Sequence, residues 1–265
     1  MPFRFNRAWE REDDKNGNSV YNESLVNLNS KGGVMKILDG KKIFTYILEE
    51  LLGPLNDVEK KYAPKELYVS GSLPIPLPGP RLSVIGSRDA SIKGLESAGK
   101  IVKTLVRNEA IVVSGLARGI DTKAHRTAIE EGGYTIAVLG TPLDKVYPRE
   151  NYKLQDIIMR QHLAVSEFPS GHETRPRDFV IRNRTMALIS DASIIVEAGD
   201  SSGSLHQGWE ALRLGRPLFI WSTLVNDPSL SWPMKMLEYG AMELDDPEEI
   251  FEHIPTHEGI LSLAL

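Results

Sequence analysis

The chain contains no cysteine among its 265 residues. This absence excludes disulfides, thiolate metal ligands and any chemistry that uses a thiol. No apolar run approaches the length that a membrane-spanning helix needs. The opening stretch MPFRFNRAWEREDD also carries charges where a signal peptide has an apolar core. We therefore expect a cytoplasmic protein with no role in a membrane.

An excess of positive charge is also missing. The chain has 31 Lys and Arg against 36 Asp and Glu, which gives a formal net charge of −5. This balance argues against a protein that coats DNA over its whole surface. It permits a local basic groove, because electrostatic steering depends on where the charges lie rather than on their sum. The hydrophobic content of 41% and the charged content of 25% are typical of a globular protein.

What the sequence does contain is a regular alternation of apolar strands and helical segments. Six segments predict strands, in chain order RLSVIG, AIVVSG, YTIAVLG, LAVSEF, ASIIVEAG and RPLFIW. Helical periodicity separates them over about 92–108, 120–133, 151–160, 178–190 and 204–213. Most of the strands are unbroken apolar runs, which favours a parallel sheet covered on both faces. The predicted class is an α/β, Rossmann-like, doubly wound and mainly parallel sheet with a small N-terminal extension.

The sequence divides into four segments around this pattern. Residues 1–34 are polar and predict an arm or tail. Residues 35–64 predict a short helical element, because Ile43, Ile47, Leu51 and Leu52 share one face of a helix over 41–52. Residues 65–225 form the Rossmann-like domain. Residues 226–265 predict a helical tail of the same domain, with helices in SWPMKMLEYGA and DDPEEIFEHI and an apolar end, ILSLAL.

Two glycine-containing turns follow the first two predicted strands. Gly86-Ser87-Arg88 ends the first strand, and a turn built from Ser114, Gly115, Arg118 and Gly119 ends the second. Free N–H groups at a helix start and a nearby guanidinium favour a bound phosphate. The alternatives are an ordinary turn for the first and a surface salt bridge for Arg118, with Asp121 as a helix cap. Neither a G-x-G-x-x-G pattern nor a P-loop lysine is present.

The stretch RPRDFVIRNRTMA combines cations with an aromatic ring. Arg175, Arg177, Arg182 and Arg184 surround Phe179, and Asn183 lies between the last two arginines. This pattern suits single-stranded nucleic acid, because cations meet phosphates while a ring stacks on a base. The alternative is a core phenylalanine with a solvated basic face.

A third glycine- and serine-rich turn, with Ser202, Gly203 and Ser204, precedes a predicted helix and is another candidate anion site. Its serines also suit helix caps. His125 and His206 have no partners at metal-ligand spacing, so no metal is expected. Ser114, Asp121 and His125 do not form the nucleophile turn of a hydrolase.

Together these segments resemble the DprA/Smf family of DNA-processing proteins. The matching segments span about residues 65–222: LYVSGSLP, Gly86-Ser87-Arg88, SGLARGIDTKAH, GGYTIAVLGTPLDKVYPREN, SEFPSG, FVIRNRTMALIS, VEAGDSSGSL and GRPLF. The resemblance implies a homodimer that binds single-stranded DNA, passes it to a RecA-type recombinase and is not an enzyme. It implies no cofactor.

The resemblance also implies roles for individual residues. Arg88, Ser114, Gly115, Arg118 and Gly119 would line a phosphate pocket. Arg175 or Arg177 would supply a backbone contact beside Phe179 and the run Arg182-Asn183-Arg184.

Two other functions remain open from the sequence. One is a nucleoside monophosphate phosphoribohydrolase of the LOG type, whose signature has a catalytic glutamate; Arg182 matches that family's arginine, but Gln207 stands where the glutamate belongs. The other is a sensor that binds a nucleotide-derived ligand.

The chain departs from the DprA/Smf pattern at one point after SGSL. It has His206-Gln207-Gly208 where that pattern continues with an apolar residue, Thr and Ala.

Overall fold

The computed structural model describes residues 11–13, 19–21, 36–38 and 40–254. Most of the predicted arm and the apolar end ILSLAL lie outside the described residues. The chain divides into two units, Met1–Gly32 and Gly33–Leu265. In the first unit, β1 (Arg11–Asp13) pairs antiparallel with β2 (Ser19–Tyr21). Among the described residues, no helix is long and apolar enough to cross a membrane.

The second unit is built on a ten-stranded mixed sheet in the order β12-β11-β10-β6-β7-β8-β9-β5-β4-β3. Every neighbouring pair from β12 to β9 is parallel, and β5, β4 and β3 extend the sheet with antiparallel pairs. The strands are β3 (Lys36–Leu38), β4 (Lys41–Tyr46), β5 (Leu67–Gly71), β6 (Arg81–Gly86), β7 (Ile111–Ser114), β8 (Thr135–Leu139), β9 (Leu163–Ser166), β10 (Ala192–Glu197), β11 (Leu218–Trp221) and β12 (Met242–Leu244). The six predicted strands and the predicted fold class are confirmed.

The helices alternate with these strands as predicted. They are α1 (Leu48–Leu52), α2 (Asp57–Tyr62), α3 (Ile92–Arg107), α4 (Ile120–Glu130), α5 (Tyr152–Gln161), α6 (Pro176–Ile189), α7 (Ser204–Arg213), α8 (Ser222–Val225), α9 (Trp232–Glu238) and α10 (Ile250–His253). Short 3₁₀ turns at Arg149–Asn151 and Pro247–Glu249 precede α5 and α10. The two helices predicted in the C-terminal tail correspond to α9 and to the 3₁₀ turn with α10.

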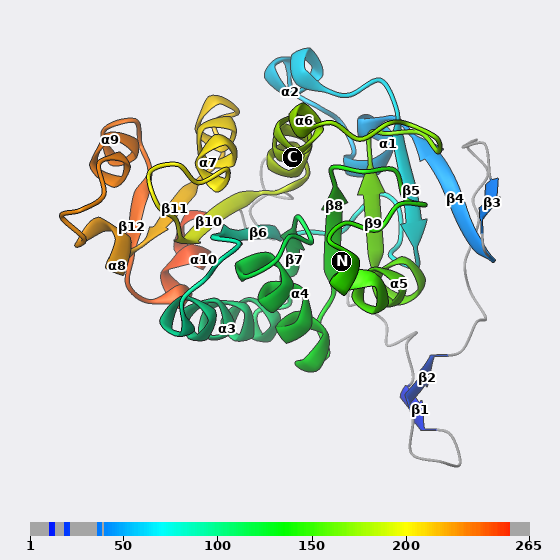
Figure 1. The fold of residues 1–265 in the computed structure, drawn as a ribbon, viewed down its shortest axis with the longest axis horizontal. Coiled ribbons are helices and arrows are strands. Elements are labelled where there is room, and N and C mark those ends of the chain that lie inside the picture. The colour runs from blue at the N-terminus through cyan, green and yellow to red at the C-terminus, as the bar shows by residue number, and fades with distance from the viewer. Residues whose placement is uncertain (1–10, 14–18, 22–35, 39, 255–265) are drawn as a thin grey trace, which may run out of the picture. The chain divides into compact units, whose positions relative to one another are not determined.

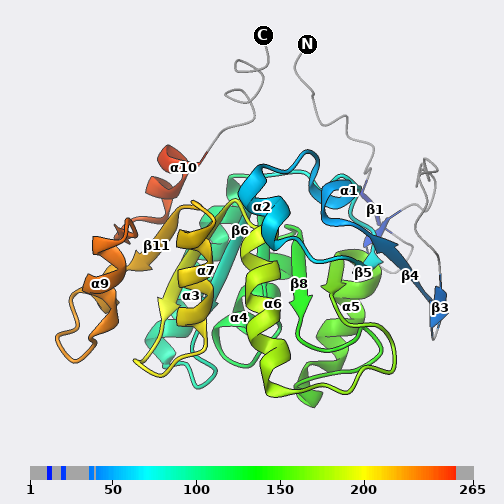
Figure 2. The same ribbon diagram turned by 90° about the horizontal axis from the view of Figure 1, so that it is seen from above.

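Helices cover both faces of the sheet because its inner strands are apolar on both sides. Alternate residues of β6 separate the two cores: Ile85 packs in a cluster with Met186 of α6, and Val84 packs in another with Ala98 of α3 and Ala124 of α4. Figure 1 shows α6 and α7 above the sheet, with α3, α4 and α5 below it. Figure 2 shows α6 and α7 side by side along the sheet.

The order of the strands creates a crevice at one point of this sheet. The chain steps from β6 outward through β7 and β8 to β9, and then returns through α6 to β10 on the other side of β6. The loops after β6 and β10 therefore leave the sheet in opposite directions. Open α/β sheets bind their ligands beyond the carboxyl ends of the strands at such a point.

The helix predicted over 41–52 is wrong for most of its length. Lys41–Tyr46 forms strand β4, which pairs with β5 through Phe44 and Val69, and only Leu48–Leu52 is helical. The segment KKIFTYILEELL carries Ile43, Phe44, Thr45 and Tyr46, which favour strands as much as helices. The backbone groups of Lys41–Tyr46 pair with those of β5, and this pairing favours a strand. The periodicity of the segment alone cannot reveal such a partner.

Two buried histidines determine part of the pH dependence of stability. Burial lowers the pKa of His125 to about 3, helped by the charges of His162 and Arg182, and burial lowers the pKa of His162 to about 4. Nδ1 of His125 lies 2.7 Å from Oγ1 of Thr135, whose hydroxyl donates to the carbonyl of Val112. The unfolded chain takes up protons near pH 6.5 that the folded chain refuses, so these groups destabilise the fold as the pH falls.

We predict that His125→Gln makes the free energy of unfolding fall less steeply between about pH 6 and pH 4, by about 1.4 kcal/mol per pH unit. Urea unfolding over a pH series measures this slope. Burial raises the pKa of Glu167 to about 7, which acts in the opposite sense above pH 4.5, but this contribution is common to both proteins. His206→Gln, at an exposed histidine, is the matched control. Parallel profiles for parent and variant would refute the assignment.

Candidate functional site

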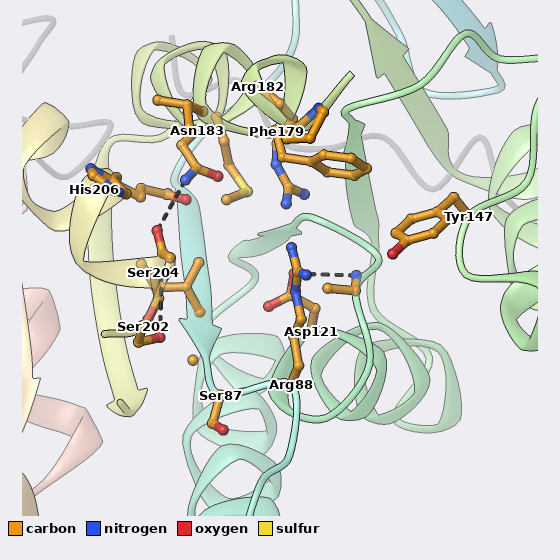
Figure 3. A pocket seen from close by; sticks show the side chains of 18 of the residues that line it. Ser87, Arg88, Asp121, Tyr147, Phe179, Arg182, Asn183, Ser202, Ser204 and His206 are labelled. Atoms are coloured by element: carbon orange, nitrogen blue, oxygen red, sulfur yellow. Dashed lines mark hydrogen bonds between the residues drawn. The ribbon is translucent and has the colours of Figure 1, made fainter. Parts of the chain in front are cut away.

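A pocket of about 930 Å³ lies at the carboxyl ends of the strands, where the strand order reverses. Its walls come from the loops that follow β6, β7, β8 and β10 and from the first turns of α6 and α7. Figure 3 shows Arg88 rising from one side of the cavity towards Phe179 and Arg182, which descend from α6 on the opposite side.

The turn after β6 is held tightly by its neighbours. The N–H of Ser87 donates to the carbonyl of Glu197 at the end of β10, and the carbonyl of Ser87 accepts from the N–H of Ile120 at the start of α4. At Gly119, φ is +67°, and a Cβ there would lie 2.2 Å from the same Ser87 carbonyl. Only glycine fits this close approach in a left-handed conformation. The turn that carries Arg88 is therefore rigid at its base.

Arg182 is a buried cation beneath the pocket. One of its terminal nitrogens donates to the carbonyls of Gly115 and Val138, at 2.5 and 3.1 Å, and its charge interacts with that of Asp121. Nε has no hydrogen-bond partner among the described residues. The carboxylate of Asp121 in turn accepts the N–H groups of Gly115 and Ala117. Arg182 thus joins α6 to the ends of β7 and β8.

Asp121 is more than a helix cap. Burial raises the pKa of Asp121, and the positive charge of Arg182 with the two backbone donors opposes that rise. The opposite charges of the two groups therefore stabilise each other, since either charge alone would be expensive to bury. Asp121 also lines the pocket, so this pair forms part of its floor.

Phe179 projects from α6 and contacts two other side chains, those of Tyr147 and Arg88. The centre of its ring lies 5.3 Å from that of Tyr147 and 5.8 Å from the guanidinium carbon of Arg88. No carboxylate among the described residues lies within ion-pair distance of Arg88. Arg88 is exposed, so its charge is free to meet a ligand.

The loop after β10 forms the other end of the pocket. Nδ2 of Asn183 donates to the carbonyl of Gly203, and the hydroxyls of Ser202 and Ser204 lie 2.6 Å apart at the start of α7. Gln207 follows one turn later and is fully buried, and its Nε2 donates to the hydroxyl of Ser83. This end therefore offers small polar groups and a helix N-terminus, while the Arg88 end offers rings and charge.

The structure brings ten of the predicted site residues together as lining of this pocket: Gly86, Ser87, Arg88, Arg175, Phe179, Arg182, Asn183, Ser202, Gly203 and Ser204. Ser114, Gly115 and Gly119 lie behind the wall. The hydroxyl of Ser114 donates to the carbonyl of Val84, and Gly115 packs against Arg182. These residues shape the pocket without facing it.

Three predicted arginines lie outside the lining. Nε of Arg118 forms an ion pair with Glu150 at 2.8 Å, as the salt-bridge alternative proposed, and Arg177 is exposed beside Asp178. Arg184 pairs with Glu210 and lies over the ring of Tyr62, on the side of α6 that meets α7 and α2. Arg184 therefore lies on a different side of α6 from Asn183 and Met186, which line the pocket.

Sequence reasoning missed several lining residues: Asp121, Thr141, Lys145, Tyr147, His206 and Gln207. Thr141, Lys145 and Tyr147 follow β8, and the rule that ligands bind beyond the strand ends could have selected that loop. Its nearness to Phe179, however, comes only from the fold. With Arg88, Lys145, Arg175 and Arg182 against Asp89 and Asp121, the lining carries more positive than negative charge. Among the described residues, no cluster of three metal-ligating side chains is present.

These features define a class of protein: a Rossmann-like α/β protein with a pocket of net positive charge at the switch point of its sheet. A model of the family described as DNA recombination-mediator protein A matches residues 49–255. The chain belongs to that family. The match extends beyond the segments 65–222 that carry the resemblance, and it includes α1, α2 and the tail through α10.

Individual relatives agree with this assignment. The chain is 33% identical over 194 residues to the DNA processing protein DprA of Bacillus subtilis, covering 72% of this chain and 65% of that protein. It is 43% identical over 157 residues to DprA of Streptococcus pneumoniae, covering 59% and 55% of the two chains. The chain thus spans between half and two thirds of the length of these relatives.

Two solved structures show the same fold. DprA from Streptococcus pneumoniae superposes with a TM-score of 0.67 at 33% identity, over 76% of this chain and 73% of that one. A structure of DNA processing protein A from Helicobacter pylori, described for its single-stranded DNA binding mode, gives a TM-score of 0.63 at 26% identity, over 78% and 94%.

A substitution at Gly115 tests how tightly the buried charges of Arg182 and Asp121 are confined. A Cβ on Gly115 would lie 1.6 Å from a terminal nitrogen of Arg182 and 2.8 Å from Oδ2 of Asp121. We predict that Gly115→Ala displaces the guanidinium and lowers the free energy of unfolding by about 3 kcal/mol, as measured by urea unfolding. Gly199→Ala is the control, because a Cβ there meets nothing within 4 Å. Equal stability of the two variants would show that Arg182 is not confined as described.

Proposed function

We propose that this protein binds single-stranded DNA in the pocket at the switch point, as a non-catalytic DNA-processing protein in recombination and transformation. The observation that carries the proposal is the meeting of an unpaired exposed arginine, Arg88, with two aromatic rings in one basic cavity. Cations and stacking rings together are what single strands require. The family and the Helicobacter pylori relative, described for single-stranded DNA binding, support the same ligand.

The two ends of the pocket suggest how a strand would lie. One phosphate would meet the guanidinium of Arg88 beside the Gly86–Ser87 turn, which holds the arginine at the edge of the cavity. A second would meet Ser202, Gly203 and Ser204 at the start of α7, which favours an anion. Arg175, at the start of α6, would hold the backbone as it leaves the cavity.

Arg118 and Arg177 would act outside the pocket. Both side chains are well exposed, at 59% and 71%, and Arg118 can reach a phosphate only by leaving Glu150. An exposed ion pair is worth about 0–1 kcal/mol, so that exchange costs little. We propose that these two arginines follow the strand beyond the cavity and contribute less than Arg88.

The proposal of a binding protein without catalysis is supported by Gln207. This side chain is fully buried, and its amide nitrogen is engaged by Ser83. An amide cannot take the charge or the proton of the glutamate that a phosphoribohydrolase uses at this point. We also propose, from the resemblance, that the protein forms a homodimer and passes its strand to a RecA-type recombinase; sedimentation and recombinase pull-down test those two steps.

We predict that Arg88→Ala weakens binding to labelled oligo-dT by about 1–3 kcal/mol, because a charge-assisted hydrogen bond is lost. It should also reduce the slope of log affinity against log salt by about 0.7, the share of one phosphate of a single strand. Gel shifts over a salt series measure both.

The control for this variant is Arg107→Ala. Arg107 is an exposed arginine at the far end of α3, paired with Glu248. The Arg107→Ala variant should bind oligo-dT as tightly as the parent does. If Arg88→Ala and Arg107→Ala bind oligo-dT equally well at every salt concentration, the pocket is not the DNA site.

We predict further that AMP and other nucleoside monophosphates remain intact when incubated with the protein, because the amide of Gln207 stands where a phosphoribohydrolase has a catalytic carboxylate. Chromatography for released base measures this. Release of base at a rate above that of a Gln207→Leu variant would establish the enzyme instead. Thermal stabilisation by a monophosphate without turnover would favour the sensor, since saturating ligand raises stability.

A further inference from the structure

Phe179 lines the pocket but is only partly exposed in this fold. A Cβ on Gly140 would lie 2.6 Å from Cδ1 of Phe179, so the ring is pressed against the end of β8. Arg88 lies over the ring and Tyr147 lies beside it, tilted by 53°. These contacts orient Phe179 and cover part of its ring.

Tyr147 is more exposed than Phe179. Its side chain is 52% exposed although it lines the pocket and touches Phe179. Figure 3 shows its ring on the side of the pocket away from Ser202 and Ser204, with the hydroxyl directed inwards. An exposed aromatic ring beside a basic pocket is the usual platform for a base.

The loop that carries Tyr147 is held in place before any ligand arrives. The hydroxyl of Thr141 donates to the carbonyl of Lys145, and the hydroxyl of Ser166 donates to the carbonyl of Thr141. Nε2 of Gln155 lies within hydrogen-bond distance of the carbonyls of Leu143 and Lys145. A fixed ring loses little conformational entropy on binding.

We infer that Tyr147 is a further stacking platform for a base of the bound strand, beside Phe179, and that Phe179 positions the Tyr147 ring. This inference rests on the proposed function and adds a residue to it. The phosphate next to the stacked base would reach Arg88 across the cavity, and Lys145, two residues before Tyr147, would meet the strand on the same side. The ring contacts any base, so this platform does not select sequence.

The test separates stacking from charge with two ligands of equal length, oligo-dT and an oligonucleotide in which abasic sites replace the bases. Tyr147→Ala should weaken binding to oligo-dT by about tenfold, within the range for one stacked base, and should not change binding to the abasic strand. Tyr147→Phe should bind both ligands as the parent does, because the ring remains. Fluorescence anisotropy at one salt concentration measures the affinities of the parent and of both variants for the two ligands.

Tyr152→Ala is the matched control, since Tyr152 is 61% exposed only five residues away but does not line this pocket. It should leave both affinities unchanged. Tyr147→Leu, which keeps apolar bulk against Phe179, covers the case in which Tyr147→Ala unfolds; it should lose the same tenfold on oligo-dT only.

Two results would overturn the inference while leaving the proposed function in place. One is a Tyr147→Ala protein that binds oligo-dT as tightly as the parent. The other is an equal loss on oligo-dT and on the abasic strand, which would mean that Tyr147 only supports the loop. If the parent itself shows no salt-dependent binding to oligo-dT, the proposed function fails first.

Discussion

The buried guanidinium of Arg182, stabilised by the opposite charge of Asp121, is the feature on which the site depends. Arg182 comes from α6 and donates to the carbonyls of Gly115 and Val138, and Asp121 holds the N–H groups of Gly115 and Ala117. Removing one partner of such a buried pair typically costs about 3–5 kcal/mol, because the other charge is left without compensation. The pair therefore holds α6, and with it Phe179 and Asn183, against the ends of β7 and β8.

The topology of the sheet explains why this feature faces a pocket. The return of the chain through α6 to β10 opens a crevice between the loops after β6 and β10, and α6 begins at its edge. Arg182 lies on the buried side of α6, whereas Phe179 lies almost one turn earlier and reaches the cavity. One helix thus supplies both the anchor of the site and part of its surface.

The four arginines between 175 and 184 illustrate how differently the fold treats equal residues. Arg182 is buried against carbonyls, Arg184 is paired with Glu210 over Tyr62, and Arg177 is exposed beside Asp178. Only Arg175 and Arg182 reach the pocket. Arg88, from a distant turn, is the exposed cation with no carboxylate in ion-pair range in the described part of the chain. Charge that is spread over the sequence becomes a groove only where the elements place it.

The sequence by itself determined the alternation of apolar strands and amphipathic helices, and with it the doubly wound sheet and the edge at which ligands bind, because strand and helix periodicities are local properties. It also predicted anion sites at the turns Gly86–Arg88 and Ser202–Ser204, which the structure places in the lining of one pocket. The sequence could not distinguish the strand over 41–46 from a helix, because its strand conformation depends on pairing with β5. Only the tertiary structure made Asp121 a buried counter-ion, turned Arg118 to Glu150 and brought Tyr147 to Phe179. Those outcomes depend on contacts between segments 30 or more residues apart, which no local pattern records.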